Sequence, residues 1–255
     1  MSNLIVEKGP LDLVITINRP ESSNALSLAL IEELLEVLSD YEDNHEIKSV
    51  VITGTGNKCF AAGGDIKELY EVRSEKAIEN MIDIGRRTID KIRYYPVPVL
   101  ALMNGHALGG GAELAIACDY RVAVERATFG FVHSTLNITT AWGGIIDLID
   151  IVGNRKALLT LIEGKALTTS EAYKIGILDS VCPNLEDATR DIKNIQQRIN
   201  NCSSSIIRGN KSIINDHKKV LHNNLKESEN REFKKSWSSK EHWESMNKLF
   251  SKSSS

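Results

Sequence analysis

The fold is decided by the stretch Asn104-Gly-His-Ala-Leu-Gly-Gly-Gly-Ala-Glu-Leu-Ala-Ile-Ala-Cys-Asp119. The apolar run before it, 97–103, predicts a strand, and its alanine-rich half, 112–118, predicts a helix. The three glycines between them therefore stand at a helix amino terminus, where N–H groups lack intrahelical partners and negative charge is stabilised. This junction predicts a loop that holds either a phosphate or a developing oxyanion.

Known phosphate loops do not match this glycine run. A P-loop carries a Lys-Ser/Thr pair after its glycines, and a dinucleotide site reads G-x-G-x-x-G. Neither pattern surrounds the glycines at 109–111. A dinucleotide site is therefore disfavoured, and an oxyanion hole for a developing enolate is the competing hypothesis.

A second glycine segment lies upstream and reads Cys59-Phe-Ala-Ala-Gly-Gly-Asp-Ile-Lys-Glu68. It follows a short apolar strand predicted at 49–53 and leads into a helical segment. Because glycine has no Cβ, backbone N–H groups in such a segment can face a cavity. Taken alone, the segment is also what an ordinary turn looks like.

The rest of the chain alternates between short apolar runs and helical patterns, which predicts an α/β core with parallel strands and crossover helices. The predicted segments are a hairpin over 4–17, a helix beginning after a cap at 24–27, a helix over 75–94, and continued alternation through 119–124, 144–151 and 154–163. From about residue 186 long helical stretches take over. We expect residues 1–185 to form the core with the site, and residues 186–255 to form a helical region that lies across the core or a neighbouring subunit.

Composition and charge exclude several classes of protein. The 255 residues are 42% hydrophobic and 25% charged, with a formal net charge of −3, which indicates a globular chain with no basic excess for nucleic acid or an anionic membrane. The lysine-rich C-terminal helices are therefore interpreted as a solvated face. No apolar run approaches the ~18 residues of a membrane span.

The four cysteines have no C-x-x-C pairing, and the histidines show no ligand-like spacing with an acid. Neither a disulfide framework nor a metal site is predicted, and buried reduced thiols favour a cytoplasmic protein.

Together the two glycine segments resemble the enoyl-CoA hydratase/isomerase (crotonase) superfamily, and matching motifs such as Asn18-Arg-Pro20 and Leu167-Thr-Thr-Ser-Glu-Ala172 extend the resemblance over nearly the whole chain. The resemblance implies a spiral of β-β-α turns and C-terminal helices that form a trimer or a dimer of trimers. It implies an acyl-CoA substrate, with coenzyme A part of that substrate and no separate cofactor.

The resemblance also assigns residues by motif position. The N–H groups of Gly64 and Gly110 are expected to hold the thioester oxygen. The residues expected beside the substrate are Ala62, Asp65, Ile66, Lys67 and Trp142. Of these, Lys67 is expected near the CoA phosphates, with a solvated surface lysine as the alternative, and Trp142 is expected to narrow the acyl pocket or to be a core aromatic. Glu21 stands where the family often has a lysine, and it would repel phosphate.

Hydratases of this family use two carboxylates around one water. The first matches Glu113, just after the triple glycine. The second belongs in a Phe-x-x-Pro-Glu stretch, which here reads Phe129-Gly-Phe-Val-His-Ser134, so His133 takes the glutamate's place. A histidine exchanges protons near neutral pH, and we expect Glu113 and His133 to be the catalytic pair.

The combination Gly-Gly-Gly-Ala-Glu, Phe-Val-His and Ala-Trp-Gly-Gly most resembles the ethylmalonyl-CoA and methylmalonyl-CoA decarboxylases. Decarboxylation of a short 2-alkylmalonyl-CoA, which needs one acid, is therefore slightly favoured. Hydration of a short-chain enoyl-CoA, with His133 replacing the second glutamate, is the alternative. A third hypothesis is a non-catalytic scaffold that binds acyl-CoA or RNA, and the intact Glu113 and glycine loops disfavour it.

Overall fold

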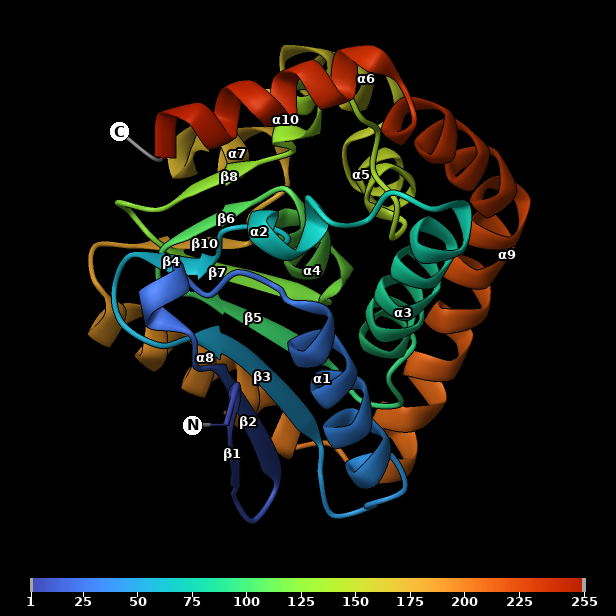
Figure 1. The fold of residues 1–255 in the computed structure, drawn as a ribbon. Coiled ribbons are helices and arrows are strands. Elements are labelled where there is room, and N and C mark those ends of the chain that lie inside the picture. The colour runs from blue at the N-terminus through green and yellow to red at the C-terminus, as the bar shows by residue number, and fades with distance from the viewer. Residues whose placement is uncertain (1, 254–255) are drawn as a thin grey trace.

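Two sheets organise the chain, and the computed structural model describes residues 2–253 of it (Figure 1). The first sheet has, in spatial order, β1 (Leu4–Lys8), β2 (Asp12–Ile17), β3 (Ser49–Gly54), β5 (Val99–Met103), β7 (Tyr120–Val124) and β10 (Ser180–Cys182). The second has β4 (Cys59–Ala61), β6 (His106–Leu108), β8 (Thr128–Gly130) and β9 (Leu167–Thr168). All neighbours are parallel except β1 with β2 and β8 with β9.

The chain winds between the sheets in repeating turns. Each turn places one strand in the first sheet and the next strand in the second, as in β3–β4, β5–β6 and β7–β8. After these pairs come α3 (Glu75–Arg93), α4 (Gly110–Ala117) and α5 (Gly144–Val152), with the short α2 (Ile66–Leu69) ahead of α3. The expected α/β spiral of β-β-α turns is therefore confirmed.

The remaining helices surround this spiral. They are α1 (Leu28–Tyr41), α6 (Asn154–Glu163), α7 (Thr169–Ile175), α8 (Leu185–Asn200), α9 (Ser204–Trp237) and α10 (Lys240–Ser253), with 3₁₀ turns η1 (Pro20–Ser22) and η2 (Val132–Leu136). The predicted cap is present, because the Ser27 hydroxyl accepts the N–H of Leu30 at 3.2 Å. The alternation expected through 154–163 is wrong, because α6 follows α5 directly across Gly153, whose φ is +78°.

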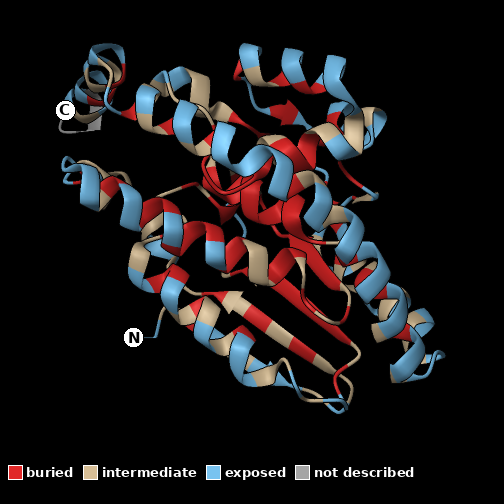
Figure 2. Cartoon of the chain, turned by 90° about the vertical axis from the view of Figure 1, so that its right-hand side faces the viewer, coloured by how far each residue is buried: buried red, intermediate tan, exposed pale blue. Residues whose placement is uncertain are grey.

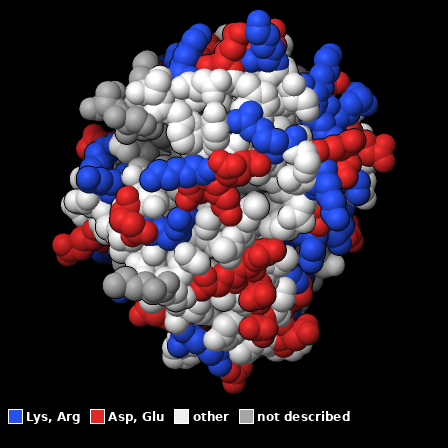
Figure 3. Space-filling model, in the orientation of Figure 1, with Lys and Arg blue, Asp and Glu red and all other residues white. Residues whose placement is uncertain are grey.

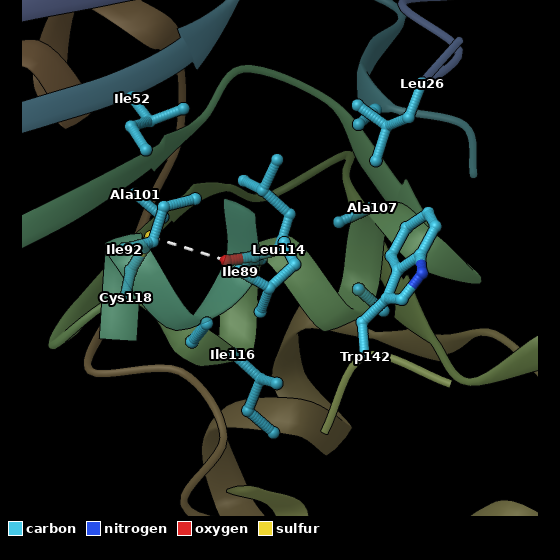
Figure 4. Close-up of a cluster of buried hydrophobic side chains, with 14 of the residues drawn as sticks. Leu26, Ile52, Ile89, Ile92, Ala101, Ala107, Leu114, Ile116, Cys118 and Trp142 are labelled. Carbon is cyan, nitrogen blue, oxygen red and sulfur yellow. Dashed lines mark hydrogen bonds between the residues drawn. The ribbon is translucent and has the colours of Figure 1, made fainter. Parts of the chain in front are cut away.

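The main core lies between the sheets and the helices α1, α3 and α4, and Figure 4 shows part of it. Every residue of β5 and of α4 is buried. Each fully buried Leu or Ile side chain contributes about 1.5–3 kcal/mol to folding. The dashed line in Figure 4 is the bond from the Cys118 thiol to the Leu114 carbonyl, 3.5 Å long. Glu113 on α4 is therefore a carboxylate on a buried helix that is otherwise apolar.

Three C-terminal helices cover different faces of the spiral. Helix α8 packs Ala188 and Ile192 against the first sheet, α9 crosses α3 and α5, and α10 lies over η2. Figure 2 faces α9 and shows its long outer surface exposed. The helical region thus lies across its own chain, while a boundary at 185/186 stays a prediction. No helix in residues 2–253 is long and apolar enough to cross a membrane.

Candidate active site

Three loops leave neighbouring parallel strands of the second sheet at one edge. Ala61 on β4 pairs with Ala107 on β6, and Ala107 pairs with Phe129 on β8. Because the carboxyl ends of parallel strands meet at the same edge, the loops after β4, β6 and β8 converge there (Figure 1). A cavity of ≈ 110 Å³ lies between them.

The two glycine loops touch each other at this edge. Gly63 and Gly109 both adopt positive φ, +101° and +53°, which glycine reaches without strain. A Cβ on Gly63 would lie 3.1 Å from the Leu108 carbonyl oxygen and 3.8 Å from the nitrogen of Gly110. Gly64 and Gly110 each follow one of these turns, and both line the cavity.

Helix α4 begins at Gly110, two residues earlier than the alanine pattern predicts. The N–H of Gly110 is therefore one of the helix's initial donors that have no intrahelical acceptor. The positive end of the helix dipole also lies here and favours a developing negative charge. The assignment of Gly64 and Gly110 as the thioester-oxygen donors stays a prediction, and their location on one cavity is what it requires.

Most sequence-predicted residues gather at this cavity. Ala62, Ile66, Glu113, His133 and Trp142 all line it, together with both donor glycines. Glu113 and His133 are the only ionisable side chains among the lining residues within the described part of the chain. The wall is otherwise apolar, so charges inside interact with little screening by water.

Glu113 is held at both carboxylate oxygens. Its Oε2 accepts the backbone N–H groups of Trp142 and Gly144, each at 2.9 Å. Its Oε1 lies 3.2 Å from Nε2 of His133. The side chain is only 2% exposed, so these donors compensate a carboxylate that would otherwise be costly to bury.

His133 stands in η2, directly after β8. Its ring stacks on Phe131 with centroids 6.0 Å apart, and its Nδ1 is buried without a hydrogen-bond partner among residues 2–253. Because Nε2 lies 3.2 Å from Glu113 Oε1, two groups able to exchange protons stand together at the cavity wall. The pair can therefore give a proton to a substrate carbon or take one from it.

Trp142 fills the space beside the glycine loops and lies at the right-hand end of the cluster in Figure 4. A Cβ on Gly110 would meet its Cζ3 at 2.5 Å, and a Cβ on Gly85 would meet its Nε1 at 2.0 Å. Two further aromatic residues, Phe233 and Trp237, line the cavity from α9. Sequence reasoning missed this pair, because nothing local shows that α9 folds back over its own site.

Asp65 and Lys67 lie outside the cavity lining. Asp65 caps α2, where its Oδ1 accepts the N–H of Lys67 at 3.2 Å, and its Oδ2 forms an ion pair with Arg19 at 2.9 Å. Lys67 and Glu21 are both exposed. Asp65 thus fastens the first glycine loop to the N-terminal segment, and the predicted contacts of Asp65 and Lys67 with substrate remain predictions.

A buried charged cluster lies behind the turn 140–144, and the sequence analysis missed it. Arg93 pairs with Asp147 at 2.6 Å and donates to the Trp142 carbonyl at 3.1 Å, and His222 lies 3.0 Å from Asp147. Burial alone would raise the pKa of Asp147, but Arg93 and His222 hold it well below its usual range. The signal in the sequence is that Arg86 and Arg93, seven residues apart, fall on the face of the amphipathic helix α3 that its apolar residues bury.

No group of three or more His, Cys, Asp or Glu able to hold a metal occurs in residues 2–253. The expectation that no separate cofactor is used stays a prediction. On the face drawn in Figure 3, basic and acidic side chains are interspersed. The predicted absence of a nucleic-acid partner is not tested by this view.

The ββα spiral places two glycine loops beside an apolar cavity that contains Glu113 and His133, an arrangement that can stabilise an anionic oxygen and transfer a proton. The sequence pattern of the enoyl-CoA hydratase/isomerase family matches residues 13–254, so the chain belongs to that family.

The chain is similar in sequence to relatives that are named for different reactions. The putative enoyl-CoA hydratase/isomerase YngF of Bacillus subtilis is 39% identical over 66% of this chain and 64% of its own length. The short-chain-enoyl-CoA hydratase of Clostridium acetobutylicum is 34% identical over 76% of this chain and 75% of its own. The ethylmalonyl-CoA decarboxylase of Bos taurus is 32% identical over 72% of this chain and 60% of its own. The resemblance to both branches is therefore confirmed.

The fold agrees with solved structures. An enoyl-CoA hydratase from Bacillus halodurans superposes with a TM-score of 0.89 at 25% identity, covering 96% of this chain and 99% of that one. The chain is an acyl-CoA enzyme of this family, and the comparisons leave its particular reaction open.

Proposed function

We propose that the protein decarboxylates a short 2-alkylmalonyl-CoA through a thioester enolate. The observation that carries this proposal is the direct contact of Glu113 Oε1 with His133 Nε2 at 3.2 Å. A hydratase of this family holds one water between two separate carboxylates, whereas here the lining has one carboxylate, Glu113, and it lies against His133. Decarboxylation needs one proton donor, and the Glu113–His133 pair supplies it.

The proposed reaction uses each part of the cavity. The bond from Cα to the substrate carboxylate breaks, CO₂ leaves, and the electron pair forms an enolate whose charge lies on the thioester oxygen. The amides of Gly64 and Gly110 are proposed to stabilise that oxygen, each by about 3 kcal/mol. The Glu113–His133 pair then gives one proton to Cα and recovers one from solvent, so one proton is consumed for each CO₂ released.

The apolar wall supports the same choice. Among the described lining residues, none carries a permanent cation that would bind the departing carboxylate. A carboxylate in such a place loses solvation that the uncharged CO₂ does not need, which favours bond cleavage. The relatives named ethylmalonyl-CoA decarboxylase add support from sequence.

Hydration of a short-chain enoyl-CoA is the second candidate. It is supported by the hydratase relatives and by the same two groups, with His133 in the second glutamate's role. In this case Glu113 and His133 would separate when a water enters.

The two candidates are separated by incubating the purified protein with ethylmalonyl-CoA and, in parallel, with crotonyl-CoA. Release of CO₂ from ethylmalonyl-CoA with unchanged crotonyl-CoA absorbance supports decarboxylation. Loss of the enoyl absorbance without CO₂ release would reject decarboxylation in favour of hydration. Turnover of neither substrate would reject both.

The predicted trimer or dimer of trimers belongs to the same proposal. Helix α9 exposes Ile206, Ile213 and Val220, of which Ile213 is 72% exposed, and α6 exposes Leu158 and Ile162. The three α9 residues are spaced seven apart and share one helix face, and an exposed apolar face favours association with another subunit. Light scattering behind a sizing column tests this, and a monomer at micromolar concentration would contradict it. The cytoplasm remains a proposal that rests on the cysteine spacing.

A further inference from the structure

Helix α9 turns polar side chains inward, against the usual pattern of a surface helix. Asn215, His222 and Glu229 are all buried and follow one another at intervals of seven residues. Each reaches a different partner, respectively the Tyr94 carbonyl at 2.7 Å, the Asp147 carboxylate at 3.0 Å, and the Arg86 guanidinium. Figure 2 shows α9 crossing the molecule along this line.

Glu229 is the member of this row closest to the catalytic turn. Its Oε2 pairs with Arg86, and the same Arg86 nitrogen donates to the Ala141 carbonyl at 2.8 Å. Its Oε1 accepts the hydroxyl of Thr140, which in turn accepts the N–H of Ile145 at 3.2 Å. Glu229 thus holds the turn 140–144 through two separate arms.

The same turn holds the catalytic acid. The N–H groups of Trp142 and Gly144 donate to Oε2 of Glu113 at 2.9 Å each. A shift of the turn would therefore move both donors and rotate Oε1 relative to His133. Small misplacements of a reacting group cost large factors in rate.

We propose that Glu229 is a positioning residue for Glu113: acting through Thr140 and Arg86, it fixes the turn whose two amides orient the catalytic carboxylate. This inference rests on the proposed function, because it assigns Glu113 the proton-transfer role. Burial raises the pKa of Glu229, Arg86 opposes the rise and the charge of Glu113 adds to it.

Two substitutions break one arm each. Thr140→Val removes the hydroxyl while nearly preserving shape, and Glu229→Gln keeps an acceptor for Thr140 but presents an amide N–H₂ to Arg86. Thr140→Ser restores the hydroxyl, and Glu227→Gln changes an exposed glutamate on the same helix as the matched control.

The readouts are hydrogen exchange of the 140–144 amides, measured by mass spectrometry, and kcat and KM on the substrate that the wild type turns over. Thr140→Val and Glu229→Gln are expected to speed exchange in this segment and to lower kcat about tenfold or more, with KM changed less than about twofold. Thr140→Ser is expected to recover most of kcat, and Glu227→Gln to match the wild type in both readouts.

Unchanged kcat in a folded Thr140→Val protein, or a rise in KM with kcat intact, would overturn the positioning role. If Glu229→Gln does not fold, the comparison of Thr140→Val with Thr140→Ser alone tests the positioning role. If the wild type turns over neither substrate, the proposed function fails, while exchange of the 140–144 amides still reports whether Glu229 orders the turn.

Discussion

The glycine loops and helix α9 both surround the cavity, yet they are built in opposite ways. The loops contribute backbone at Gly64 and Gly110, in conformations that the local sequence dictates. Helix α9 contributes side chains whose role depends on partners more than 50 residues away, such as the Asp147 carboxylate that His222 contacts. The first region is readable one segment at a time, and the second becomes meaningful only once the chain is folded.

The contrast predicts different consequences of mutation. Changes in the loops and at Glu113 should remove catalysis from a protein that remains stable. Changes in the cluster of Arg93, Asp147 and His222, where α9 meets α3 and α5, should lower stability first, because buried charges there compensate one another.

The largest effect is expected from Glu113→Gln. The amide keeps the shape and an acceptor for the Trp142 and Gly144 amides, but it cannot exchange the proton, so kcat should fall about 10²- to 10⁴-fold. The melting temperature should remain close to that of the wild type. Glu186→Gln, at an exposed position near the start of α8, is the control. Turnover unchanged in Glu113→Gln would mean that another group is the acid.

On the other side of the comparison, Asp147→Asn should lower the free energy of unfolding by about 3–5 kcal/mol, because the buried Arg93 keeps only the partly exposed Asp90 as a charge partner. Denaturant titration measures this. Asp216→Asn on the exposed face of α9 should change it by less than about 1 kcal/mol. Equal stability of the two variants would show that the cluster contributes nothing net.

The same aspartate gives the protein a defined acid sensitivity. Its pKa is depressed in the folded state, so the unfolded state takes up the proton first and stability falls as the pH drops below about 4. Above that pH its contribution is complete. Repeating the titrations from pH 6 downward should show a shallower acid loss in Asp147→Asn than in the wild type, and parallel curves would contradict the assignment.

Gly110→Ala and Gly209→Ala compare a glycine of the cavity loop with a glycine of α9. A Cβ at Gly110 would lie 2.5 Å from Trp142 Cζ3, so the loop or the ring must move and the proposed donor with it. Loss of one such donor typically costs about 10²- to 10³-fold in kcat. Gly209→Ala, in α9, meets nothing within 4 Å and should leave kcat unchanged while stabilising the helix by up to about 1 kcal/mol. Equal rates in both variants would remove Gly110 from the mechanism.

The smallest effect is expected from Lys67→Gln. An exposed charge pairing with a phosphate is worth about 0–1 kcal/mol, so KM for an acyl-CoA should rise by no more than about fivefold. The difference should shrink as salt is added. Lys156→Gln, another exposed lysine, provides the reference. A KM identical to the wild type at low salt would make Lys67 a solvated surface residue.

The local signals of strands, glycine turns and helices predicted an α/β core with parallel strands, and the family resemblance added the spiral. The cavity followed, since Ala62, Gly64 and Gly110 stand directly after neighbouring strands. Sequence reasoning failed for α9, because the polar residues of a surface helix usually face water, whereas here several are buried. The interpretation of the C-terminal lysines as a solvated face is wrong at Lys211, which is buried and pairs with Asp119 at 2.7 Å, while Ile213 is 72% exposed.

Deuterium uptake at Cα of butyryl-CoA in D₂O tests the central claim most directly, because it requires only an enolate in the cavity and neither CO₂ release nor hydration. The wild type is expected to exchange this hydrogen, and Glu113→Gln is expected to exchange it about 10²- to 10⁴-fold more slowly. If butyryl-CoA binds to the wild type and no deuterium enters Cα, the cavity does not stabilise an enolate and the account is wrong.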